Sequence, residues 1–311
     1  MNTMTTLLRR ETWEHRAIYI APAIFAGLFV LLALLATAGA IHIQISEPGA
    51  DVDLRAMIGS MDAGQLSALI QTGLASMAVF FNVVVLLVTV FYLLDSLYAE
   101  RKDRSILFWK PLPVSDLAVV TSKLLTAAVL IPLVSAVVFL ATAVVVMLIA
   151  GTFALFSGSG IIFAVGPGAI ADTMVTLIYA LLVQSLWYLP LFAWLLLVSA
   201  WSRRTVLLWA VLPLWAVAVL EQMFLRTHLF AELLRERLVG VFPLAFNTKV
   251  HEVEWAYSGE NADMHLSLAE DLRHLIDPGA LLFSPGLWGG LVAAVVLTAA
   301  AIWIRRYRDE T

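Results

Sequence analysis

The residues that could carry catalytic chemistry are few, and their spacing does not suit it. His251 and Glu252 begin a zinc-protease helix pattern, but no second histidine follows three residues on. His265 and His274 are nine residues apart, which on a helix separates them by about 13 Å along the axis. That distance is too long for one metal ion. We therefore predict no metal site here and interpret these groups as a solvated polar face.

Two acids in apolar surroundings, Asp95 and Asp172, could form an aspartyl dyad inside a membrane. They are expected at opposite ends of their helices, so they cannot share a proton. No lysine follows a glycine, which excludes the phosphate-binding loop of P-loop ATPases. The chain has no cysteine, so thiolate metal sites and cysteine nucleophiles are excluded as well. We expect no catalytic residue, no metal and no cofactor bound by this chain.

The composition indicates a membrane protein. Of the 311 residues, 61% are hydrophobic and 14% are charged, whereas soluble domains are about half apolar and about a quarter charged. The net charge of −4 does not suggest a nucleic-acid partner. Crossing a bilayer takes about 20 apolar residues, and we predict one all-α membrane domain over residues 1–311 with six spans at 17–41, 73–97, 117–150, 172–199, 205–225 and 285–304.

The first span has to be distinguished from a signal peptide, because basic residues precede it and small residues follow it. Its apolar run of about 25 residues exceeds the 7 to 15 expected of a signal peptide, which favours a retained helix. Orientation follows from the basic residues, which concentrate on the cytoplasmic side. Thirteen of the nineteen Lys and Arg residues fall on the side that carries both chain ends. We therefore expect both termini in the cytoplasm.

Several segments depart from simple crossings. Pro132 should bend the long third span, and the glycines from 151 to 168 indicate a short outer or re-entrant hairpin. Residues 51–72 have helical apolar spacing, which fits an amphipathic helix at the outer interface and equally a packing helix. Residues 226–284 form an outer loop too long for a plain connection, and it has helical pattern at 230–234 and 266–276.

The link between the second and third spans, residues 98–116, carries the strongest local signal. A charged run from Glu100 to Arg104 leads into an apolar aromatic run that ends at Phe108 and Trp109 on the cytoplasmic side. Ser115 can cap the next helix. A short amphipathic helix here could be gripped by a soluble partner. Alternatively, it lies on lipid with Trp109 at the headgroup level.

At this link the sequence resembles the permease subunits of ABC transporters of the ABC-2 type. In that family a Glu-Arg pair ends the second span, followed by a small residue with Ser or Thr, an apolar stretch, Leu-Pro-Val-Ser and a lysine early in the third span. The matching positions are Glu100-Arg101, Ser105, Ile106 to Trp109, Leu112-Pro113-Val114-Ser115 and Lys123. Arg104 stands where many members have glycine. Six spans and inner termini extend the resemblance to the whole chain.

The resemblance implies a pair of permeases served by two separate ATPase subunits, which hold the ATP and Mg. The second permease would be an identical copy or a paralogue. It also implies a bacterial plasma membrane location and an export function by alternating access. The link would be the coupling helix, and residues 1–16 an elbow helix at the inner surface; an unstructured tail is the alternative. The implied coupling residues are Glu100, Arg101, Asp103, Arg104, Ser105, Ile106, Leu107, Phe108 and Trp109, and the implied elbow residues are Leu7, Leu8 and Trp13.

The cargo is expected to be hydrophobic or amphipathic, such as a peptide, a lipid or a drug-like compound, because the predicted spans have no fixed charge in their middle. Asn82, Gln184, Trp187 and Tyr188 are candidates for lining its pathway. They could instead pack helices together or lie in the interfacial aromatic belt. Two other function classes remain open: an ion-coupled secondary transporter, and a membrane enzyme or scaffold.

Overall fold

The computed structural model describes residues 3–38, 43–44, 51–52, 63–102, 115–157, 167–241 and 276–308. Within them the chain is helical, apart from an antiparallel pair of two-residue strands. The elements in chain order are α1 (Thr3–Glu14), α2 (Ala17–Thr37), β1 (Ile43–Gln44), β2 (Asp51–Val52), α4 (Ala63–Lys102), α6 (Asp116–Leu125), the π-helix η1 (Thr126–Leu130), α7 (Ile131–Ser157), α8 (Pro167–Trp187), α9 (Leu189–Trp201), α10 (Val206–Phe224), α11 (Leu229–Val239), α13 (Pro278–Leu282) and α14 (Pro285–Arg308).

Six helical stretches in the described chain are long and apolar enough to cross a membrane, which confirms the predicted number of spans. Length and composition together are those of an all-α, multi-pass membrane protein. The stretches are Ala17–Thr37, Ile70–Lys102, Asp116–Thr152, Ile170–Trp187, Val206–Phe224 and Pro285–Tyr307.

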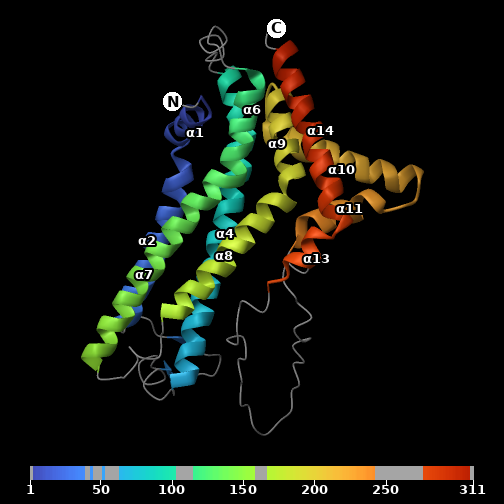
Figure 1. The fold of residues 1–311 in the computed structure, drawn as a ribbon. Coiled ribbons are helices and arrows are strands. Elements are labelled where there is room, and N and C mark those ends of the chain that lie inside the picture. Colours follow the sequence, from blue (N-terminus) through green and yellow to red (C-terminus); the bar gives the residue numbers. More distant parts are fainter. Residues whose placement is uncertain are drawn as a thin grey trace.

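The helices pack lengthwise into a bundle. In Figure 1, α2 runs beside α7 and α14 runs beside α9, with α4 in contact with both groups. Aromatic rings fill the centre: the centroids of Phe81 and Phe139 are 5.5 Å apart in an edge-to-face contact. Many apolar side chains on the outside are exposed, as lipid contact requires. Close van der Waals packing, rather than escape from water, holds such helices together.

The third span is interrupted where Pro132 was expected to bend it. Pro132 has no N–H to donate to the carbonyl of Ala128, and its ring crowds that carbonyl. The chain responds with the wider turn of η1 directly before Ile131. Figure 1 shows the chain changing direction between α6 and α7.

The fourth span is not the single helix expected over 172–199. It breaks at Tyr188, whose backbone angles are φ −86° and ψ 2°, and it restarts as α9. Pro190 is the second residue of α9, where its missing N–H costs nothing to the new helix. The prediction of one helix over 172–199 was wrong because Pro190, like Pro132, has no N–H to donate to a helix that runs through it.

The outer segments differ in part from expectation. Asp51 and Val52 pair with β1, and residues 63–72 belong to α4, so a separate helix over 51–72 is not formed by these described parts. Helix α7 continues to Ser157, which moves the start of the expected hairpin beyond Gly151. Helix α11 confirms the pattern at 230–234. Residues 53–62, 158–166 and 242–275, with most of the pattern at 266–276, lie outside the described residues.

Candidate functional site

A buried group of charges joins four helices at the end of the bundle where the second span finishes. Lys123 of α6 has its Nζ 2.9 Å from Glu11 Oε1 of α1 and 3.0 Å from Glu100 Oε1 of α4. Arg305 of α14 places its Nη1 2.9 Å from Glu100 Oε2. We call Glu11, Glu100, Lys123 and Arg305 the buried ion cluster. It connects the N-terminal helix α1 with the second, third and sixth of the long apolar stretches.

Burial makes the pairing of these charges obligatory. Lys123 is 0% exposed and Glu11 is 1% exposed. Transferring a single charge out of water costs several kcal/mol unless partners compensate it. Two carboxylates and two cations balance in the cluster, and the hydroxyl of Tyr92 donates to Glu11 Oε2 at 2.7 Å. Loss of Lys123 would remove the cation that lies 2.9 Å from Glu11 and 3.0 Å from Glu100.

The sequence at the start of α6 explains how Lys123 is positioned in the buried ion cluster. The Ser115 hydroxyl accepts a hydrogen bond from Ala118 N at 3.2 Å, so α6 begins with the cap that its sequence predicts. Lys123 follows Asp116 by seven residues, two helical turns, so both lie on one face. Val119 and Val120, which precede Lys123 by about one turn, are buried as well, so this face of α6 is inside the bundle.

Arg305 also contacts the two acids on either side of the 103–114 link. Its Nε is 3.1 Å from Asp116 Oδ1, in addition to its pair with Glu100. A second contact fixes the start of the link, because Arg101 donates to the carbonyl oxygens of Ser199 and Ser202 at the end of α9. The chain therefore enters and leaves residues 103–114 at positions anchored to α9 and α14.

Two of the predicted coupling residues are thus placed by the structure, and both engage neighbouring helices. Glu100 belongs to the buried ion cluster, and Arg101 binds the end of α9. The remaining ones lie outside the described residues, and their role stays a prediction: Asp103, Arg104, Ser105, Ile106, Leu107, Phe108 and Trp109.

The N-terminal segment is a helix, as expected, and the cluster ties it to the bundle. Leu7 and Glu11, one turn apart on α1, are both buried, whereas Leu8 is half-buried. Trp13 is 70% exposed, with the Arg9 guanidinium 5.0 Å from its ring centre. An exposed tryptophan beside arginine is typical of a helix at a lipid headgroup surface. The elbow role of this helix remains a prediction.

Glu11, Glu14 and His15 bring their ligand atoms within 4.8 Å of one another, a spacing that could suit a metal ion. Cations of the protein already engage both acids. Glu11 pairs with Lys123, and Glu14 accepts from Arg10 Nε at 2.6 Å. These ion pairs account for the grouping.

Trp187 and Tyr188, two of the pathway candidates, lie at the break between α8 and α9 and bind α11. The indole of Trp187 donates to the Arg237 carbonyl at 3.0 Å, and the Tyr188 hydroxyl donates to the Leu238 carbonyl at 2.7 Å. The Arg237 guanidinium lies 4.4 Å from the Trp187 ring centre and donates to the carbonyl of Gly286. Both aromatic side chains are buried in this contact, and a pathway role for them remains a prediction.

Replacing Arg237 with methionine is expected to loosen α11 from the bundle. The change removes the ring contact and the bonds to two carbonyls, each bond with a charged donor being worth about 1.5–3 kcal/mol. Thermal unfolding of the purified chain should show a lower midpoint. Arg235→Met is the matched control, because Arg235 is exposed on the same helix. Equal midpoints for the two variants would contradict the role given to Arg237.

Asn82 and Gln184, the other pathway candidates, each bury a polar atom that has no hydrogen-bond partner in the described part of the chain: Asn82 Nδ2 and Gln184 Oε1. A buried unpaired polar atom costs about 1–3 kcal/mol. The unpaired atoms of Asn82 and Gln184 therefore do not stabilise the described fold.

Sequence reasoning found Glu100 and Lys123 through the family motif but missed Glu11, Tyr92 and Arg305. Glu11 is separated from Lys123 by 112 residues and Arg305 from Glu100 by 205. No local spacing rule reaches across such distances. One available signal was Glu11 itself, an acid one turn after Leu7 on the apolar face of a helix.

Comparisons with known proteins add no relative from which a role could be carried over. No family model matches the chain, and neither a curated protein nor a solved structure matches it.

Proposed function

We propose that this chain is the permease subunit of an ABC-2 type transporter that exports a hydrophobic or amphipathic cargo. In this proposal two copies, or one copy and a paralogue, span the membrane. Separate ATPase subunits bind ATP and Mg on the cytoplasmic side, at the 98–116 link. Both termini of the chain lie on that same side. The chain itself moves cargo by alternating access and performs no chemistry.

The observation that carries the proposal is the anchoring of the link by the buried ion cluster. Arg305 pairs with Glu100 and Asp116, the acids on either side of residues 103–114. Glu100 also pairs with Lys123, which reaches α1 through Glu11. A force on the link is thereby transferred to three helices at once. Coupling of ATP-driven motion to membrane helices needs a stiff connection of this kind.

The distribution of charge favours an amphipathic or hydrophobic cargo over a small ion. Among the described residues, the buried charged side chains are the four members of the buried ion cluster. Ion-coupled transporters usually place ionisable groups in mid-membrane, where they relay protons or ions. An ATP-driven mechanism on separate subunits requires no such relay.

The experiment that tests the proposal is affinity purification of the tagged chain from its native membrane in mild detergent. We expect an ATPase to co-purify at one copy per permease and to hydrolyse ATP in the eluate. Reconstituted vesicles should then move cargo only when ATP is supplied. Purification of the chain alone from membranes that contain all its partners would contradict the proposal and make ion-driven transport the next test.

Gln184→Met is expected to reduce transport without reducing stability. The sulfur-containing side chain has nearly the same size and removes the unpaired oxygen, so the unfolding midpoint should stay equal or rise. ATP-driven flux should fall if the amide contacts cargo, and Asn82→Leu should behave alike. Leu182→Met, a lipid-exposed position on the same helix, is the control. Unchanged flux with a lowered midpoint would assign these amides to packing instead.

A further inference from the structure

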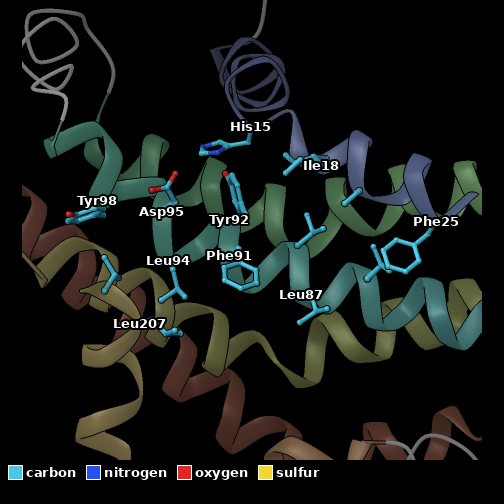
Figure 2. Close-up of a pocket in the computed structure, with 15 residues that line it drawn as sticks. His15, Ile18, Phe25, Leu87, Phe91, Tyr92, Leu94, Asp95, Tyr98 and Leu207 are labelled. Atoms are coloured by element: carbon cyan, nitrogen blue, oxygen red, sulfur yellow. The ribbon is translucent and has the colours of Figure 1, made fainter. Parts of the chain in front are cut away.

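A groove of about 730 Å³ runs along α4, between the start of α2 and the start of α10. Its volume falls within the range of about 300–1,000 Å³ that small-molecule sites occupy. Figure 2 shows Phe25 and Leu87 toward one end, and Asp95 and Tyr98 toward the other. Between these ends the lining is apolar apart from His15 and Tyr92. The groove therefore has the two-part character of an amphiphile: a hydrocarbon channel with a polar terminus.

The apolar part is long and open at the side. Phe91 is 62% exposed and Leu87 is 51% exposed on α4, and Leu207 of α10 is 57% exposed opposite them. From Val84 to Asp95 the helix advances by about 16 Å. An extended alkyl chain can lie along this length and leave through the open side into lipid.

The polar end carries a negative charge that the protein does not neutralise. The Asp95 side chain is exposed to the groove, and no ion pair or hydrogen bond to it is present within the described ranges. His15 lies near it. Desolvation by burial is the largest cause that lowers the pKa of His15 below its ordinary value of 6.5, which disfavours the charged imidazole. His15 is therefore a weak counter-charge for this carboxylate.

Asp95 can attract a cation from the end of the groove. It lies five residues before Glu100, toward the end of the apolar stretch Ile70–Lys102, and its side chain is exposed. A cationic group that enters this end of the groove would therefore meet an opposite charge. The rings of Tyr98 and Phe91 flank the same end of the groove and offer faces that attract ammonium groups. An anionic headgroup would instead be repelled by Asp95.

We propose that this groove binds a cationic amphiphile, with its ammonium group at Asp95 and its alkyl chain along the α4 wall toward Leu87. The inference rests on the proposed function, because it narrows the exported cargo to amphiphiles that carry a positive charge. It places the headgroup near the cytoplasmic end of the span and the tail in the inner leaflet. Cargo would enter from the lipid, through the open side of the groove.

The test uses the purified full-length chain in phosphatidylcholine nanodiscs, without ATPase or ATP. The probe is a dodecyl trimethylammonium with a photoreactive diazirine on its tail, compared with the sulfonate and the alcohol of the same chain length. Irradiation followed by peptide mass spectrometry locates the labelled residues. We expect saturable labelling of the α4 groove by the ammonium probe and none that saturates by the other two.

Two variants check the roles of charge and space. Asp95→Asn should raise the probe concentration for half-saturation about fivefold, as loss of one exposed ion pair does at the upper end of its range. Asp95→Glu should retain binding. Leu87→Trp should block labelling by filling the channel, whereas Leu133→Trp, a lipid-facing position on α7 that does not line the groove, should not.

Equal saturable labelling by the anionic or neutral probe would overturn the proposal, and so would an Asp95→Asn variant with wild-type half-saturation. The outcome is independent of the coupling test. If an ATPase co-purifies while the ammonium probe fails to saturate, the cargo inference falls and the transporter proposal stands. If the probe binds at Asp95 but the chain purifies alone, the site stands and the ATP-driven mechanism falls.

Discussion

Lys123→Met is expected to destabilise the folded chain by about 3–5 kcal/mol, the cost of breaking a buried ion pair by removing one partner. Glu11 would keep the hydroxyl of Tyr92 and the more distant imidazole of His15, and Glu100 would keep Arg305 and the more distant Arg10. Methionine fills the space of the lysine stem, so lost packing contributes little. Thermal unfolding in detergent should show a midpoint lower by roughly 10 °C, together with a reduced yield of inserted protein.

Lys102→Met is the control for this loss, because Lys102 is an exposed lysine at the end of α4. It should leave the midpoint unchanged. Adding Glu11→Gln to Lys123→Met removes the charge left unpaired and should recover part of the stability. If Lys123→Met is as stable as Lys102→Met, the pairing of Lys123 with Glu11 and Glu100 does not stabilise the folded chain. If the double variant recovers nothing, the loss comes from packing and not from charge.

In the proposed transporter, replacing Phe108 and Trp109 together by alanine is expected to detach the ATPase while leaving the chain inserted and folded. Aromatic anchors buried in a protein interface contribute about 2 kcal/mol or more each, so losing one should weaken association about thirtyfold and losing both about several hundredfold. Co-purified ATPase activity per permease should fall accordingly. The unfolding midpoint should not change, because the buried ion cluster that anchors the link is intact.

The matched control replaces Trp303 and Tyr307 by alanine, two aromatic residues on α14 that are each 63% exposed. This variant should retain the ATPase. Undiminished ATPase recovery with the Phe108 and Trp109 variant would assign the aromatic run to the lipid surface, as its composition also permits. Equal losses for both double variants would show that general removal of aromatic surface, and not the link, weakens the complex.

The spans could be predicted from sequence because lipid imposes one rule, about 20 apolar residues, on every crossing. The rule depends on composition alone and does not detect breaks in the backbone. It therefore predicts one span where the structure has α8 and α9, separated at Tyr188 and followed by Pro190. It also ended the second span at its last apolar residues, whereas α4 begins at Ala63 and continues to Lys102.

The site could be predicted only where a known motif named its residues. Glu100 and Lys123 are adjacent to the link in sequence, and the family pattern contains both. Their partners Glu11 and Arg305 come from the first and last described helices, and the helix packing alone brings them together. From sequence, Arg305 was one of several arginines that set the orientation. Its pairing with two specific acids depends on how α14 lies against α6.

The two ion pairs of Arg305 also mean that the link can be fixed only late in synthesis of the chain. The ribosome makes α4 and α6 well before α14, because Arg305 follows Asp116 by 189 residues. Until α14 is inserted, Glu100 and Asp116 lack their shared arginine, and the link between them is not held at both ends. In the proposed transporter, a nascent chain without α14 would therefore present a link that is not yet fixed at both ends. We expect stable assembly with the proposed ATPase only after α14 has been inserted.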